Sequence, residues 1–98
     1  MKSILQDDTT HCFLCGMNTN LERLDVHHIY GASNRKKSEQ YGLKVYLHHK
    51  KCHIFGENSV HQNNEINNKL NAIAQRKAME YYDWDVDTFR SIFGKNYL

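Results

Sequence analysis

The chain lacks several features that would place a protein in a familiar class. It has no proline, three cysteines, and no apolar run near the roughly 20 residues needed to cross a bilayer. An odd number of cysteines argues against a secreted disulfide scaffold. The first eight residues lack the apolar stretch of a signal peptide. We therefore expect a cytosolic protein with no membrane partner.

The charge is also too small to identify a partner. The formal net charge is +2, and the basic residues gather in two places, Arg35–Lys37 and Lys50–Lys51, beside the segments rich in histidine. A mild excess of positive charge does not by itself establish nucleic-acid binding. With 98 residues, 40% of them hydrophobic, the chain makes one domain with a modest core, so a bound metal would be a useful substitute for missing apolar contacts.

Two segments are predicted to be strands. Residues 24–30 are rich in β-branched and aromatic side chains and are followed by the breaker sequence Gly31-Ala32-Ser33-Asn34. Residues 43–47 alternate apolar and polar positions, which predicts a second strand with Leu43, Val45 and Leu47 facing inward.

The C-terminal part is predicted to be helical. Apolar or long side chains recur at steps of three and four residues, and Ala74 and Ala78 widen this face; the series is Ile66, Leu70, Ile73, Lys77 and Tyr81. Ser59 is the predicted N-cap of a helix that ends near Tyr82. A second helix is predicted over 86–93, capped by Asp85 and ended by Gly94. The fold class is therefore α+β, with a loose lead-in over 1–10, a metal-binding hairpin over 11–58 and a helical tail over 59–98.

A structural zinc site is predicted from two short pairs of ligands. Cys12 and Cys15 are separated by two residues, as are His49 and Cys52. This gap lets one turn present two ligands to one tetrahedral ion. His48 and His11 are alternatives to His49 as the fourth ligand. The other interpretations are a metal-free chain and a redox pair at Cys12 and Cys15, but no βαβ pattern surrounds those cysteines.

The adjacent histidines His27 and His28 indicate a second site. Neighbours on a strand point to opposite faces, so the two rings cannot have the same role. With His53 and His61 downstream, one ring could bind a metal while the other acts as a general base near neutral pH.

These motifs resemble those of the HNH endonucleases, the ββα-metal or His-Me finger group, and especially small phage-encoded members with a zinc knuckle. The resemblance covers Cys12 to about His61, and residues 89–98 resemble the ending of phage proteins of this kind. It implies a ββα-metal core, a structural Zn²⁺, and one catalytic divalent cation, which could be Zn, Ni, Mn or Mg.

The resemblance also implies roles for individual residues. His28 corresponds to the general base, and His27 and His53 correspond to ligands of the catalytic metal. His61 is the first candidate for a further ligand, and Glu57 is the second. The chain departs from the family pattern at Lys44, where an asparagine is expected, and Asn34 is a possible substitute. It also has His49 where a cysteine is usual.

The function expected from this resemblance is metal-dependent hydrolysis of phosphodiester bonds, with double-stranded DNA as the partner. Arg35, Lys36 and Lys37, expected in a loop after the first strand, are candidates for contacts with DNA phosphates. The protein would act as a monomer or a homodimer in the cytosol of a bacterial host. Two alternatives stay open: a non-catalytic, zinc-stabilised DNA-binding accessory protein for phage recombination or assembly, and a purely structural phage protein.

Overall fold

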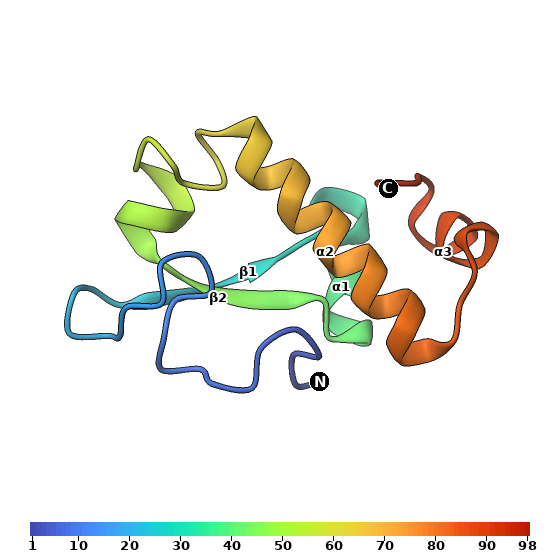
Figure 1. Ribbon diagram of the computed structural model, residues 1–98, viewed down its shortest axis with the longest axis horizontal. Helices are drawn as coiled ribbons and strands as arrows, with labels where there is room; N and C mark the ends of the chain where they lie inside the picture. The colour runs from blue at the N-terminus through green and yellow to red at the C-terminus, as the bar shows by residue number, and fades with distance from the viewer.

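Two short strands and the helices packed on them form the frame of the protein (Figure 1). The computed structural model describes residues 1–98. In chain order the elements are β1 (Leu24–His28), the 3-10 turn η1 (Ala32–Asn34), α1 (Arg35–Tyr41), β2 (Lys44–His48), the π-helical turn η2 (His49–Ile54), α2 (Asn64–Tyr82) and α3 (Val86–Phe93). These elements confirm the predicted α+β class.

The strands β1 and β2 pair antiparallel and form the sheet. Val26 lies opposite Tyr46 at the centre of the register, and the pairing ends where His28 meets Lys44. Leu43, Val45 and Leu47 are all fully buried, which confirms the inward face predicted from the alternation of residues 43–47.

The helix α1 was not predicted. Arg35, Lys36 and Lys37 belong to its first turn rather than to a loop. The helix is fixed by Ser38, whose buried hydroxyl donates to the carbonyl of Tyr30 and accepts from the amide of the same residue. Only seven residues long, α1 is too short for a helical period to stand out in the sequence, and the preceding Gly-Ala-Ser-Asn sequence masked its start.

The helix α2 begins later than expected. Its N-cap is Asn63, whose side chain accepts from the amide of Ile66, and not Ser59. The hydroxyl of Ser59 is instead buried without a hydrogen-bond partner. Residues before Asn63 are drawn away from helical geometry because the amides of Val60 and His61 bond to the carbonyls of η2. The predicted end at Tyr82 is confirmed.

The buried face of α2 is narrower than the predicted one. Leu70, Ala74 and Ala78 are buried, whereas Ile73 and Tyr81 are 42% and 58% exposed. Positions four residues apart follow one face of a helix, and here the series from Leu70 through Ala74 to Ala78 faces the sheet. The prediction gave large side chains precedence over alanines, although close packing against a sheet favours small ones.

The helix α3 has the predicted bounds. Asp85 accepts from the amide of Thr88, and Gly94 ends the helix with a positive φ of 83°. Phe89 and Phe93 on this helix are buried and stack at 4.8 Å between ring centroids. They pack against Tyr30, which follows β1, so the C-terminal helix is attached directly to the sheet.

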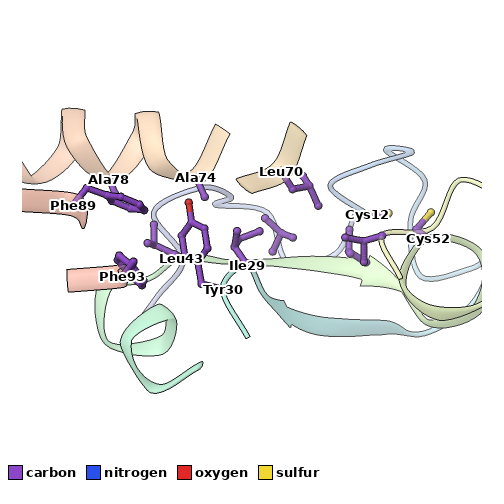
Figure 2. Packing of buried hydrophobic residues seen from close by; sticks show 13 residues of the cluster. Cys12, Ile29, Tyr30, Leu43, Cys52, Leu70, Ala74, Ala78, Phe89 and Phe93 are labelled. Carbon is purple, nitrogen blue, oxygen red and sulfur yellow. The ribbon is translucent and has the colours of Figure 1, made fainter. Parts of the chain in front are cut away.

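The core is one continuous row of buried side chains beneath α2 (Figure 2). It runs from Phe89 and Phe93 on α3, through Leu43 and Ile29, to the buried cysteines Cys12 and Cys52 at the far end. The cysteines therefore form the end of the core that lies farthest from α3. None of the helices is both long enough and apolar enough to traverse a membrane.

Candidate metal centres

Three cysteines and one histidine converge at the end of the core. The ligand atoms of Cys12, Cys15, His48 and Cys52 all lie within 4.8 Å of one another. Cys12 and Cys15 come from a tight turn in which the amide of Gly16 bonds to the carbonyl of Cys12. Gly16 adopts a φ of 75°, the left-handed conformation that glycine enters without steric cost.

The histidine of this cluster is His48, which corrects the assignment of His49. His48 is fully buried, and its Nδ1 lies 3.2 Å from the sulfur of Cys15. His49 instead places its Nδ1 2.5 Å from Asp25, and the other alternative, His11, is exposed and contacts Asp8. The physical reason is the turn η2: ligands four residues apart share a face of a helical turn, so His48 pairs with Cys52.

The ring of His48 is oriented by a second contact. Its Nε2 lies 2.9 Å from the backbone carbonyl of Asn18. A carbonyl only accepts, so Nε2 carries the proton and donates it, and Nδ1 keeps its lone pair toward the cysteines. Metal-binding histidines are commonly fixed in this way by a backbone carbonyl behind the ring.

The thiols influence one another strongly. Burial acts to raise the pKa of Cys12, but the backbone amides of Cys15, His48 and Leu14 outweigh it and lower the pKa to about 7. Burial, followed by the neighbouring Cys12 and Cys15, raises the pKa of Cys52. Three thiolates so close together repel one another, and a divalent cation would remove that repulsion.

The donor set and spacing are compatible with a structural zinc. Zinc bonds of about 2.0–2.3 Å place tetrahedral ligand atoms roughly 3.3–3.8 Å apart. In this structure the four ligand atoms lie within 4.8 Å of one another, so small side-chain movements would bring them to these tetrahedral distances. Four ligands, three of them sulfur, fill a tetrahedron and leave no position for a substrate.

A second cluster contains only histidines. The ligand atoms of His27, His53 and His61 also lie within 4.8 Å of one another. His27 Nδ1 is 3.3 Å from His53 Nε2, and the rings of His53 and His61 are 4.8 Å apart between centroids. His61, the first candidate for a further ligand, therefore belongs to this cluster, whereas Glu57, the second candidate, lies outside it.

The chain after η2 brings His61 to this cluster. The amide of His61 bonds to the carbonyl of His53, so the loop folds back over the turn. Gly56 makes this possible because a Cβ there would come within 1.9 Å of the carbonyl oxygen of Lys51. A single glycine thus sets how closely the loop that carries His61 approaches η2.

The electrostatics of the histidine cluster favour the neutral form of His27 and of His61. Burial, and then the neighbouring His53, His61 and His28, lower the pKa of His27 to about 3. Burial and His53 also lower the pKa of His61. His27 is therefore uncharged at neutral pH, the form in which imidazole binds metals. Its buried Nε2 has no hydrogen-bond partner, so the protein alone leaves one polar atom of this cluster unsatisfied.

His28 points to a different partner, as strand alternation predicts. Its Nε2 lies 2.9 Å from the carboxylate of Glu39 on α1. Lys44, directly opposite His28 in the sheet, also binds Glu39, with its Nζ at 2.8 Å from Oε2. Together Lys44, His28 and the amino group of Met1 lower the pKa of Glu39 to about 2. The ionised carboxylate accepts from Nε2–H and leaves His28 Nδ1 free to take a proton.

One cleft gathers these side chains. It has a volume of about 560 Å³, and its lining includes His27, His28, His53, His61 and Arg35. His28 thus shares a cavity with the whole histidine cluster, although it makes no contact with Asp25 or the cysteines.

The predicted phosphate-binding residues do not all lie there. Arg35 lines the cleft, whereas Lys36 borders a shallower hollow beside His28 and Glu39. Lys37 donates from its Nζ to the carbonyl of Ile92 at the end of α3, so this amine is already engaged. Asn34 donates its side-chain amide to the carbonyl of Phe93, which makes it part of the packing of α3.

The prediction named His48 only as an alternative ligand, and it missed Asp25, which contacts His53, and Glu39, which contacts His28. One signal was in the sequence. His48 and Cys52 are four residues apart, as are His49 and His53, which indicates two faces of one helical turn. Asp25 and Glu39 gave no comparable signal because their partners are distant in the chain.

A scan against protein-family models gives no match to this chain, and searches of the curated proteins and of the solved structures give no match either. The chemistry of the two clusters is therefore the basis for assigning a function.

Proposed function

We propose that this protein is a metal-dependent endonuclease of the HNH type, encoded by a phage or prophage, that hydrolyses phosphodiester bonds of double-stranded DNA. The proposal rests on one observation above all. His28, with a free ring nitrogen, shares a cleft with three clustered imidazoles and with Arg35. A proton acceptor, a potential cation site and a guanidinium beside one cavity are what hydrolysis of a phosphodiester requires.

We assign the strands β1 and β2, with the ligand-bearing turn after them, to the ββα-metal class. In this assignment η2 takes the place of the helix and contributes His53, while the end of β1 contributes His27 and His28. Lys44 stands where an asparagine was expected. Its contact with Glu39, which also holds His28, supports a different means of orienting the base in this chain.

The reaction we propose is a hydrolysis in which water attacks phosphorus in line with the leaving 3′ oxygen. His28 Nδ1 takes the proton of the attacking water, and the bond from phosphorus to the 3′ oxygen breaks. The leaving 3′ oxygen takes a proton from solvent water, so the products are a 5′-phosphate and a 3′-hydroxyl. Glu39 stabilises the imidazolium formed on His28 through the hydrogen bond to Nε2.

Two groups would stabilise the charge that develops on the phosphate. Arg35, on the rim of the cleft, would bind a non-bridging phosphate oxygen. A divalent cation bound by His27, His53 and His61 would supply charge neutralisation at the phosphoryl and leaving oxygens. Imidazole ligands suit zinc, nickel and similar ions, whereas magnesium prefers oxygen ligands.

The decisive variant is His28→Ala. It should reduce nicking of a supercoiled plasmid by about 10²–10⁴-fold, because that is the usual contribution of a positioned general base. Zinc content and circular dichroism should stay at wild-type values. His11→Ala is the matched control, since His11 is exposed and its ring hydrogen-bonds only to the nearby Asp8 and Thr10.

Two results would contradict the proposal. One is cleavage by His28→Ala at the wild-type rate. The other is an inactive wild-type protein with each of zinc, nickel, manganese and magnesium. If that inactive protein still bound DNA, it would fit the non-catalytic DNA-binding accessory protein.

A further inference from the structure

Asp25 on β1 contacts the histidine cluster from behind, and the proposed reaction does not use it. Its Oδ2 lies 2.9 Å from Nδ1 of His53 and 2.5 Å from Nδ1 of His49. The Asp25 side chain is 22% exposed and that of His53 is 15% exposed, so the contact is largely shielded from water. Arg23 is a weaker partner, with its Nε 3.6 Å from Oδ1.

The contact decides which nitrogen of His53 carries the proton. One carboxylate oxygen of Asp25 faces the Nδ1 atoms of both His53 and His49. An ionised carboxylate only accepts hydrogen bonds, and therefore Nδ1 of His53 must donate. The lone pair of the neutral His53 ring is then on Nε2, which lies 3.3 Å from Nδ1 of His27.

The strand geometry makes this arrangement a consequence of the fold. Asp25 and His27 are two residues apart on β1, so both point to the same face of the sheet. The ring of His53 lies between them, with one nitrogen toward each. For two nitrogens bound to one tetrahedral zinc, bonds of about 2.0–2.1 Å give a separation of roughly 3.3 Å. The separation between His27 and His53 already has this value.

We propose that Asp25 is a positioning residue that fixes the tautomer and the ring orientation of His53 for binding a divalent cation together with His27 and His61. This role rests on the cation site of the proposed function. A carboxylate behind a metal-binding histidine typically strengthens metal affinity by about 10–100-fold. His49, the other partner of Asp25, is not a member of the cluster and serves as an internal comparison.

The test is a calorimetric titration of the zinc-loaded, full-length protein with Ni²⁺. The wild type should bind one Ni²⁺ in addition to its zinc. Asp25→Ala should bind it about 10–100-fold more weakly, and Asp25→Asn should fall between the two. His49→Ala removes the other hydrogen bond to Asp25 and should bind Ni²⁺ within about threefold of the wild type, the spread expected when the positioning group is intact. Zinc content, measured before and after, confirms that Ni²⁺ has not displaced zinc.

A second measurement needs no variant. Long-range ¹H–¹⁵N spectra of the zinc-loaded wild type at neutral pH should show His53 with its proton on Nδ1. A proton on Nε2 would overturn the role of Asp25, and so would Asp25→Ala binding Ni²⁺ as tightly as the wild type. Absence of any Ni²⁺ binding to the wild type would instead remove the cation site itself, and the proposed function with it.

Discussion

The cysteine cluster and the histidine cluster differ in the number of their potential ligands, in donor type and in exposure. The first has four ligands, with Cys12, His48 and Cys52 all buried. The second has three potential ligands that differ in exposure. The His27 side chain is 8% exposed, whereas His61 is exposed and lines the cleft. Closed four-ligand sites stabilise folds, whereas sites with a free position admit water or substrate.

The same short turn serves both clusters. His48, just before η2, and Cys52, within it, belong to the cysteine cluster. His49 and His53, also in this turn, contact Asp25 instead. Cys52 and His53 are adjacent in the chain. A metal bound at the cysteine cluster would therefore also fix the backbone that orients His53 in the histidine cluster. A metal bound at the cysteine cluster would fix this turn in a chain that has only a modest core.

The largest effect should come from His48→Ala. Structural zinc contributes about 10–16 kcal/mol of apparent binding free energy in zinc-finger peptides, which is comparable to the 5–15 kcal/mol that stabilises a whole domain. We therefore expect His48→Ala to lose zinc and unfold. His49→Ala should keep its zinc and its fold, because His49 contacts Asp25 instead. Zinc content and thermal melts of the two variants distinguish them.

The reverse outcome, with zinc lost from His49→Ala and kept by His48→Ala, would show that the histidines exchange places when the ion binds. In that case His49 would be the zinc ligand in place of His48.

A smaller effect should follow from Gly56→Ala. The new Cβ would lie 1.9 Å from the carbonyl oxygen of Lys51, so the backbone over η2 must move. We expect a loss of about 1–3 kcal/mol in the free energy of unfolding, the usual cost of overpacking, and weaker Ni²⁺ binding at the histidine cluster. Gly16→Ala is the control. Its Cβ would meet no atom within 4 Å, and only its positive φ makes it costly, by about 1 kcal/mol. Urea denaturation curves measure both, and equal losses would argue against a special role of Gly56.

The smallest effect concerns Glu39, beside the open site. Its pKa in the folded state is about 2, below the ordinary 4.5, so its ion pairs stabilise the fold fully above pH 4.5 and progressively less as the pH falls toward 2. Because the side chain is 43% exposed, we expect Glu39→Gln to cost less than about 1 kcal/mol. The difference in melting temperature between wild type and variant should be constant above pH 4.5 and should shrink as the pH is lowered from 4.5 toward 2. A difference that grows on acidification would contradict this account.

Elements with strong local signals were predicted well. The helix α3 has its expected cap and terminating glycine, Asp85 and Gly94, because capping is decided within a few residues of chain. The inward positions of β2 followed from simple alternation. The helix α1, by contrast, depends on the contact of Ser38 with Tyr30, which no local pattern contains.

The candidate site shows the same division. The side chains that form each cluster were nearly all named, since cysteine and histidine are few and their spacings restrict them. The choice of His49 over His48 was wrong because the right choice required knowing that the chain after β2 turns as a π-helix. The contacts of Asp25 and Glu39 were out of reach because each joins residues 11 to 28 positions apart.

The sequence by itself determined the inventory: two groups of metal-binding side chains, a strand pair and a helical tail, each fixed by spacing and by the chemistry of single residues. Only the tertiary structure decided which ring faces which cluster and which carboxylate lies behind each ring. The reason is geometric: neighbouring residues of a turn point in different directions, and a hydrogen bond between distant residues exists only once the packing of the chain has placed them together.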